Sequence, residues 1–317
     1  MTVTCPVCQS EKKSFLFTAF DILYKMVEDK FIMYKCRDCA AIYLSPFPSQ
    51  KETERFYPKN YYSYDTEESD GFFERLKKKI IQSKMDGENG LSWGDRILVF
   101  LFKNKFSGIP LYRKESGKFL DIGCGSGKNL SLLNRYGWDT YGIELDADAV
   151  QHAKSQGLKV ERSSIETANF GDIKFDSIRI WHVFEHLTNP QKAIEQLKDW
   201  LVDDGEILMA LPNAHSWARI ILGRYWYGLD VPRHVISYSP ETLFFLMNKN
   251  GLKISELKYS SCGSFVGSIS NFLRRECGYQ GNLVNNIFLI FLFAPLDYLS
   301  DIFKRGDTIF LKIQKNG

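Results

Sequence analysis

The sequence lacks several features that would place it in a specialised class of protein. Its 317 residues contain no apolar run of about 18 to 20 residues, the length that a membrane-spanning helix needs. No basic stretch followed by an apolar one opens the chain, so we expect a cytoplasmic protein without a secretory signal. No internal repeat or low-complexity tract is present, which argues against a solenoid or a fibrous protein.

An excess of charge of one sign is also missing. Lysine and arginine number 41 against 38 acidic residues, and the net charge is only +3. Domains that bind nucleic acid usually carry a concentrated basic face, so this balance argues against a nucleic-acid partner. The hydrophobic fraction of 44% is ordinary for a globular protein with a real core. The length allows one large domain and a smaller module.

Cysteines number seven, an odd count, and four of them form two C-x-x-C pairs, Cys5–Cys8 and Cys36–Cys39. In a chain without a secretory signal, such pairs favour metal binding over a disulfide framework. Four thiolates can hold Zn²⁺ tetrahedrally, and a closed site of this kind is structural. We therefore predict a structural zinc in a module at residues 1–45. Redox chemistry is the weaker alternative, because no thioredoxin-like pattern surrounds either pair.

Three segments combine a crowded apolar face with few charges or a basic edge. Two of them, at 72–84 and 95–106, belong to a connector expected at residues 46–116. The third, an apolar helical insertion at about 282–304, is the most apolar stretch of the chain. Helices of this kind pack on a core, pack on another subunit or lie on a membrane surface. The sequence leaves these three outcomes open, and with them the oligomeric state.

From residue 118 the chain alternates between strand and helix patterns. Buried or alternating apolar runs predict strands at 118–123, 140–146, 158–166, 175–183, 205–213, 252–261 and 307–315. Helices are expected after the first, second and fourth of these strands, with Asp146 as one cap and a proline in the first turn of another. This alternation predicts a doubly wound α/β domain at residues 117–317 with a mostly parallel sheet.

A glycine-rich loop, LDIGCGSGKN, follows the first of these strands. Glycines at Gly123, Gly125 and Gly127 allow positive φ and close approach of a ligand to the backbone. A dinucleotide fingerprint would place its third glycine at Lys128, so the spacing differs. Glu144 ends the next strand, where a carboxylate can accept both ribose hydroxyls of a bound nucleoside.

Residues 118 to about 260 resemble class I S-adenosylmethionine-dependent methyltransferases. They are most similar to the branch with an E-H-L-x-x-P motif, here FEHLTNP, a fifth strand ending in Pro-Asn, and a stretch such as WYGLDVPRH. The resemblance implies a seven-stranded, Rossmann-like sheet and S-adenosylmethionine as cofactor. Ser164 stands where the family often has an acidic residue at the adenine. The resemblance implies that the cofactor lies against Asp121, Gly123, Cys124, Gly125 and Gly127 (methionine end), Glu144 and Leu145 (ribose), Ser164 and Ile165 (adenine), and Trp181 and His182 (sulfonium).

Three of the five histidines fall in segments expected to face the acceptor: His182, His186 and His234. Methyl transfer needs alignment of the reactants, and it needs a base only if the acceptor must lose a proton. Histidine suits that role at neutral pH, so these three are the catalytic candidates. Structural roles for them stay open. Ubiquinone-pathway O-methyltransferases carry E-x-x-E-H here and can bind a divalent ion, but His182 replaces the first carboxylate in this chain.

The acceptor is the least determined part of the prediction. Methyltransferases that act on activated sugars and cell-surface glycans resemble this layout, with a four-cysteine module ahead of the catalytic domain. We therefore expect a sugar or other small acceptor, with nucleotide-linked and lipid-linked forms both open, and a peripheral membrane contact as one option. The rival interpretations are an RNA or protein methyltransferase that docks through the zinc module, and a cofactor-binding partner protein without catalysis.

Overall fold

The computed structural model describes residues 4–58, 75, 79–80, 83, 91–102, 117–261, 263–284 and 286–316. The amphipathic segment expected at 72–84 lies almost wholly outside these residues. Of the segment expected at 95–106, the part up to residue 102 belongs to helix α3 (Trp93–Phe102). None of the helices among the described residues is long and apolar enough to cross a bilayer.

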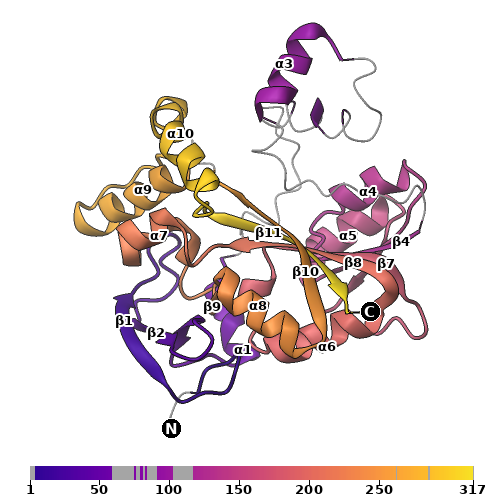
Figure 1. Ribbon diagram of the computed structural model, residues 1–317, viewed down its shortest axis with the longest axis horizontal. Coiled ribbons are helices and arrows are strands. Elements are labelled where there is room, and N and C mark those ends of the chain that lie inside the picture. The colour runs from indigo at the N-terminus through magenta and orange to yellow at the C-terminus, as the bar shows by residue number, and fades with distance from the viewer. Residues whose placement is uncertain are drawn as a thin grey trace.

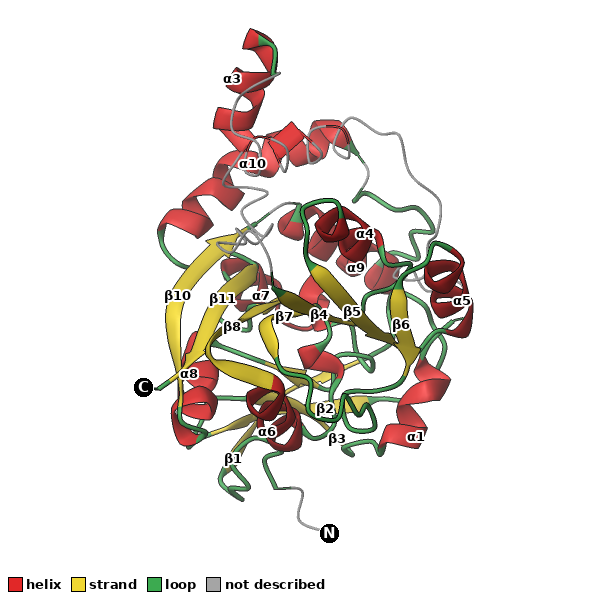
Figure 2. Cartoon of the chain, turned by 90° about the vertical axis from the view of Figure 1, so that its right-hand side faces the viewer, coloured by secondary structure: helices red, strands yellow, loops and turns green. Residues whose placement is uncertain are grey.

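A seven-stranded sheet dominates the chain from residue 118 (Figures 1 and 2). Its order is β10-β11-β8-β7-β4-β5-β6, and only β11 runs against its neighbours, which confirms the predicted mostly parallel α/β sheet. The strands are β4 (Lys118–Ile122), β5 (Asp139–Glu144), β6 (Lys159–Arg162), β7 (Phe175–Trp181), β8 (Leu201–Pro212), β10 (Leu252–Ser260) and β11 (Thr308–Lys315).

Helices cover both faces of this sheet, α4 (Lys128–Asn134) and α5 (Ala147–Ser155) on one side and α6 (Pro190–Trp200) and α8 (Pro240–Lys249) on the other (Figure 2). Three of them begin at side-chain caps. Asp146 Oδ1 accepts from Ala149 N at 2.8 Å, as predicted, and Asn189 and Ser239 cap α6 and α8.

Two helices are inserted between β10 and β11, namely α9 (Ser264–Glu276) and α10 (Ile287–Ile302). The apolar run at about 282–304 predicted α10, whereas no sequence pattern predicted α9. A further irregular segment follows β8 and contains α7 (Trp217–Leu222) and the single turns η4 (Gly223–Tyr225) and η5 (Tyr227–Leu229). In Figure 1, α7, α9 and α10 lie together on one side of the molecule.

The N-terminal residues form a second, antiparallel sheet of β1 (Lys13–Ala19), β2 (Phe31–Cys36), β3 (Ile42–Ser45) and β9 (Ile236–Ser237). Its last strand, β9, comes from the C-terminal part of the chain and pairs with β3, so strand pairing ties the N-terminal segment to the part of the chain that carries the large sheet. After β3 come α1 (Gln50–Thr53) and η1 (Glu54–Phe56). Buried residues of both sheets form one hydrophobic core. The division into module, connector and domain stays a prediction.

Candidate functional site

The glycine loop joins β4 to α4 and has the conformation that its composition predicts. Gly123, Gly125 and Gly127 have φ of 70°, 53° and 81°, a region that disfavours other residues. A Cβ on Gly123 would lie 2.5 Å from Val183 Cγ2, so no larger residue fits there without a shift. Because Val183 directly follows His182, the loop lies against the segment that carries two of the predicted catalytic histidines, His182 and His186.

Glu144 is the last residue of β5, and its side chain contacts this loop. Its carboxylate accepts hydrogen bonds from the backbone N–H groups of Gly125 at 2.9 Å, Leu145 at 2.7 Å and Asp146 at 3.0 Å. Ser163, one residue before Ser164, donates its N–H to the Glu144 carbonyl oxygen at 3.1 Å. The segments predicted to hold ribose and adenine are therefore neighbours at the carboxyl edge of the sheet, where ligands of open α/β folds bind.

Asp121, predicted at the methionine end, is fully buried at the end of β4. Arg179 Nη1, from the neighbouring β7, donates to both of its carboxylate oxygens at 2.9 and 3.0 Å. Burial raises the pKa of Asp121, and the Arg179 charge opposes this shift. Sequence reasoning missed Arg179, although an arginine inside the apolar strand FDSIRIW is the kind of residue that needs a buried partner.

The other predicted cofactor residues differ in exposure. The Cys124 thiol is buried, which raises its pKa, and a Cβ on Gly142 of β5 would lie 2.7 Å from its sulfur. Leu145 is exposed, whereas Ile165 is buried in the core. Ser164 Oγ bonds the Thr167 hydroxyl at 3.0 Å. At the end of β7, the Trp181 ring packs on Phe310 with 5.3 Å between centroids, and the Arg179 guanidinium lies over it.

All three predicted histidines gather around one buried carboxylate, Glu185. His182 follows β7 in a left-handed conformation with φ of 53°, and η3 (Phe184–His186) begins two residues later. His182 Nδ1 lies 3.3 Å from Glu185 Oε1, and His234 Nε2 lies 3.9 Å from the same oxygen. The rings of His186 and His234 meet edge to face at 4.6 Å. A non-glycine residue held at positive φ beside a buried carboxylate is typical of a functional site.

The charges of this cluster are strongly perturbed. Burial works to raise the pKa of Glu185, but the hydrogen bond with His182 and the adjacent histidines outweigh it and lower the pKa to about 2. Glu185 Oε2 is buried and has no hydrogen-bond partner among the described residues. Burial and the neighbouring His234 lower the pKa of His186 to about 4, so its ring is neutral at pH 7.

Tyr57 completes the cluster from the predicted connector. Its hydroxyl lies 2.9 Å from His186 Nδ1, and the Arg233 carbonyl oxygen lies 3.1 Å from the same nitrogen. His234 Nδ1 lies 2.9 Å from the Gly228 carbonyl oxygen. Sequence reasoning did not place Tyr57 in the site. The crowding of tyrosines from residue 57 to 64 was the available signal, but nothing local says which of them reaches the site.

A divalent ion has three possible ligands here. Glu185, His186 and His234 each offer one ligand atom, and these atoms lie within 4.8 Å of one another. His234 is remote in sequence from Glu185 and His186 but lies beside them in the structure. This chain lacks the first carboxylate of the E-x-x-E-H motif, and His234 offers the third possible ligand atom. Carboxylate and imidazole suit several transition metals.

A buried arginine clamps the N-terminal sheet onto this site. Arg233 has no exposed surface, and its Nη2 lies 2.8 Å from Asp21 Oδ1 and 2.7 Å from Asp230 Oδ1. Its Nη1 donates to the Phe56 carbonyl oxygen at 2.9 Å, just before Tyr57. Burial opposes its charge, but the two carboxylates raise the pKa of Arg233 above its ordinary value. The Asp and Arg of the WYGLDVPRH stretch are therefore structural partners.

The four paired cysteines come together at the other end of the N-terminal sheet. Cys5 Sγ lies 3.5 Å from Cys39 Sγ and Cys8 Sγ lies 3.5 Å from Cys36 Sγ, and all four sulfurs lie within 4.8 Å of one another. Tetrahedral zinc with Zn–S bonds of about 2.3 Å would place its sulfurs roughly 3.8 Å apart. The contact with Cys39 and the N–H groups of Cys8 and Val7 lower the pKa of Cys5 to about 5, although burial opposes this. The donor set and its spacing fit a zinc ion.

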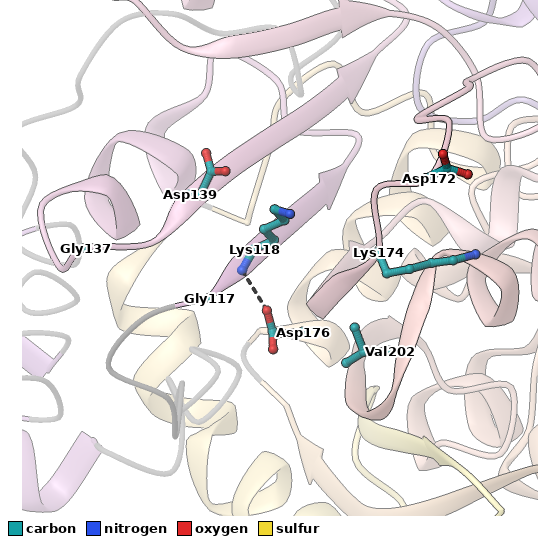
Figure 3. Close-up of a pocket in the computed structure, with 8 residues that line it drawn as sticks. All are labelled: Gly117, Lys118, Gly137, Asp139, Asp172, Lys174, Asp176 and Val202. Carbon is teal, nitrogen blue, oxygen red and sulfur yellow. Dashed lines mark hydrogen bonds between the residues drawn. The ribbon is translucent and has the colours of Figure 1, made fainter.

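The hollow shown in Figure 3 lies at the opposite edge of the large sheet. It has a volume of about 590 Å³ and is lined at the amino ends of β4, β5, β7 and β8. Two of its charged side chains are engaged: Asp176 accepts from Lys118 N at 2.8 Å, and Lys174 Nζ donates to the Asp199 carbonyl oxygen at 2.7 Å. This hollow is separate from the loop and the histidines.

Comparison with known proteins finds methyltransferases among the curated relatives of this chain. The curated relatives include the ubiquinone biosynthesis O-methyltransferase of Glaesserella parasuis, 34% identical over 129 residues that make up 37% of this chain and 55% of the relative. That of Histophilus somni is 23% identical over 197 residues, 58% of this chain and 76% of the relative. The chain spans about half the length of most of the curated relatives it matches.

Solved structures with a similar fold include two methyltransferases. One is an S-adenosylmethionine-dependent methyltransferase from Archaeoglobus fulgidus, with 19% identity over 74% of this chain and 98% of that chain and a TM-score of 0.44. Another is a possible histamine N-methyltransferase from Thermotoga maritima, with 15% identity over 77% of this chain and 94% of that chain and a TM-score of 0.44.

A family model described as a methyltransferase domain matches residues 93–257. This stretch is about half of the chain and contains the glycine loop, Glu144 and all three predicted histidines. The chain therefore belongs to the methyltransferase domain family, and the prediction of a class I S-adenosylmethionine-dependent methyltransferase is confirmed at that level.

Proposed function

We propose that this protein transfers a methyl group from S-adenosylmethionine to a hydroxyl group of a sugar or another small acceptor. The observation that carries the proposal is the contact between two halves of one site. Gly123, in the predicted cofactor loop, packs against Val183, which directly follows His182 and leads into the Glu185 cluster. A cofactor on the loop and an acceptor at the histidines would thus meet at the carboxyl edge of the sheet.

The residues of the loop fit the cofactor. Three glycines at positive φ leave the backbone open to a ligand, and Glu144 is held by three N–H groups where a ribose is expected. When bound there, S-adenosylmethionine supplies a methyl group on a sulfonium that is already a good leaving group. The protein must then mainly align the acceptor oxygen with that methyl group.

His186 and Tyr57 are the groups that we assign to the acceptor proton. The His186 ring is neutral at pH 7, because burial and His234 lower its pKa to about 4, so it has a lone pair available. In the tautomer whose Nδ1 is unprotonated, Nδ1 accepts from the Tyr57 hydroxyl at 2.9 Å, so Tyr57 can relay a proton from the acceptor to the ring; once protonated, Nδ1 can donate to the Arg233 carbonyl oxygen at 3.1 Å. His182, whose side chain is 39% exposed, is the histidine best placed to contact an incoming acceptor.

Two observations support an oxygen acceptor of small size. The curated relatives quoted above are named O-methyltransferases, and the histidine cluster offers a base for a hydroxyl. A sugar is proposed because the chain resembles methyltransferases that carry a four-cysteine module before the catalytic domain. We also propose that Cys5, Cys8, Cys36 and Cys39 hold a structural zinc that stabilises the N-terminal sheet and hence the position of Tyr57.

Calorimetric titration of the full chain with S-adenosylhomocysteine tests the cofactor assignment, with NAD as the control ligand. We expect micromolar binding of S-adenosylhomocysteine and none of NAD. Gly125→Arg should abolish this binding, because a side chain would enter the loop at a position with φ of 53°. Wild-type protein that binds NAD instead would refute the proposal. With binding established, a screen of sugar nucleotides, lipid-linked sugars and phenols with radiolabelled cofactor identifies the acceptor; turnover on RNA or protein alone would overturn a small acceptor.

A further inference from the structure

Helix α10 carries its polar residues toward the protein and presents a stripe of large apolar residues outward, while Phe293 and Leu296 pack on the core. Asp297 is 1% exposed, and its Oδ2 accepts from Gly263 N at 2.8 Å. Asp301 Oδ1 accepts from the Ser261 hydroxyl at 2.9 Å, and Ser300 is buried. A surface helix of a globular protein normally shows the opposite arrangement. The outward face of α10 therefore has the composition of a binding surface and not of a surface exposed to water.

That face is continuous and uncharged. Its side chains are between 44% and 72% exposed and recur at the three- and four-residue spacing of one helical stripe, continued by the residue that ends the helix. We define the α10 face as Phe288, Phe291, Leu292, Tyr298, Leu299, Ile302 and Phe303. It extends onto α7, because the Trp217 ring stacks on Phe303 at 5.5 Å and Ile221, one turn further along α7, is 65% exposed. An exposed apolar patch of this kind marks an interaction site.

The helices that form and flank the α10 face carry a net positive charge. Residues 217–226 and 263–306, which form α7, α9 and α10 and their turns, contain six arginines and lysines against three acidic residues. One of these acids, Asp297, is buried, whereas Lys304, which directly follows Phe303 of the α10 face, is exposed. A second copy of this chain on the same face would bring like charges together, which disfavours such a dimer. An apolar face on helices of net positive charge is the pattern of a helix that lies on an anionic membrane surface.

We propose that the α10 face docks on an anionic lipid surface. The helix pair α9 and α10 is inserted between Ser260, which ends β10, and Thr308, which begins β11. That edge is the carboxyl edge of the parallel strands, the same edge at which the glycine loop and the His182 segment lie. Docking through α10 would therefore hold the candidate acceptor site beside the bilayer. A lipid-linked acceptor would fit this arrangement. This inference about the acceptor rests on the function proposed above.

Sedimentation of the full chain with vesicles tests the docking without any turnover. One set contains phosphatidylglycerol and phosphatidylcholine in equal amounts, and the other contains phosphatidylcholine alone. The test variant is Phe291→Glu with Leu292→Glu, two changes on the α10 face. The matched control is Phe15→Glu on β1, because Phe15 and Phe291 are both 62% exposed and β1 lies far from α10 in both views (Figures 1 and 2). Circular dichroism melting confirms that each variant folds.

We expect wild-type and Phe15→Glu protein to sediment with the anionic vesicles and the double variant to bind them at least about tenfold more weakly. Lys304→Gln should weaken binding to anionic vesicles only. Wild-type protein that stays in the supernatant, or a double variant that still binds, would overturn the proposal. So would equal binding to neutral vesicles, or a dimer in analytical ultracentrifugation that the double variant dissociates. Vesicle binding without S-adenosylhomocysteine binding would refute the proposed function and leave the docking surface standing.

Discussion

Replacement of Arg233 by methionine tests how the N-terminal sheet is held on the candidate site. The guanidinium has no exposed surface and contacts two carboxylates, from Asp21 and Asp230, at 2.8 and 2.7 Å. Methionine keeps the apolar volume but removes the charge. Asp21 and Asp230 would then remain in a poorly solvated site without their counter-ion.

Breaking a buried ion pair on one side costs about 3–5 kcal/mol, because the remaining charge is uncompensated. We therefore expect Arg233→Met to lower the free energy of unfolding by about that amount. With a denaturant slope of roughly 3 kcal/mol per molar urea, the unfolding midpoint should fall by about 1–1.7 M. Urea titration followed by tryptophan fluorescence and by far-ultraviolet circular dichroism measures the change with two probes.

The matched control is Arg135→Met, because Arg135 lies exposed at the end of α4. That change should alter the free energy of unfolding by less than about 0.5 kcal/mol. The triple variant Asp21→Asn, Asp230→Asn, Arg233→Met removes all three charges and should recover most of the loss. If Arg233→Met destabilises the protein no more than Arg135→Met does, the buried clamp is not what holds the two sheets together.

Four further predictions concern the cofactor, the zinc and the acceptor site. Glu144→Ala should weaken S-adenosylhomocysteine binding by at least about tenfold in calorimetry, since a ribose contact of roughly 1.5–3 kcal/mol is lost; parent-like affinity would contradict the ribose assignment. Cys36→Ser should lose zinc in native mass spectrometry and destabilise the N-terminal sheet, and an unchanged metal content would refute the four-thiolate site. Tyr57→Phe should lower kcat about tenfold or more at similar KM, while Tyr34→Phe on β2 serves as the control. Because the pKa of His186 is lowered to about 4, kcat should stay level from pH 8 down to about pH 5 and fall below it; an acid limb near pH 6.5 would contradict the assignment.

Local patterns were sufficient to predict the large sheet and the cofactor loop. A parallel strand buried on both faces needs a continuous apolar run, and a strand-to-helix turn with positive φ needs glycine. Both features can therefore be predicted from short stretches of sequence. The caps at Asp146 and Ser239 follow the same rule, since each bonds an N–H group three residues away. The predicted metal, acceptor and cofactor residues themselves stay predictions, because no comparison or contact tests them.

Helix α9 shows where local patterns fail. Its sequence, SFVGSISNFLRRE, is rich in serine, and a polar segment of this kind does not predict a buried helix. In the structure, Ser264, Ser268 and Ser270 lie buried, and the Ser268 hydroxyl bonds the Ser264 carbonyl oxygen at 2.7 Å. The hydrogen bond within the helix satisfies a polar group that composition would assign to the surface.

The sequence by itself determined the seven strands of the large sheet, most of the helices between them, the glycine loop and the two C-x-x-C pairs, because each depends on residues close together in the chain. Only the tertiary structure decided which groups share the acceptor site. Tyr57 reaches His186 across 129 residues, and Asp21 reaches Arg233 across 212. The outward direction of the apolar stripe on α10 also depends on Asp297, whose buried bond to Gly263 spans 34 residues. Such contacts depend on how elements pack in three dimensions, and hydrophobic periodicity specifies which face of a helix is apolar but not what that face meets.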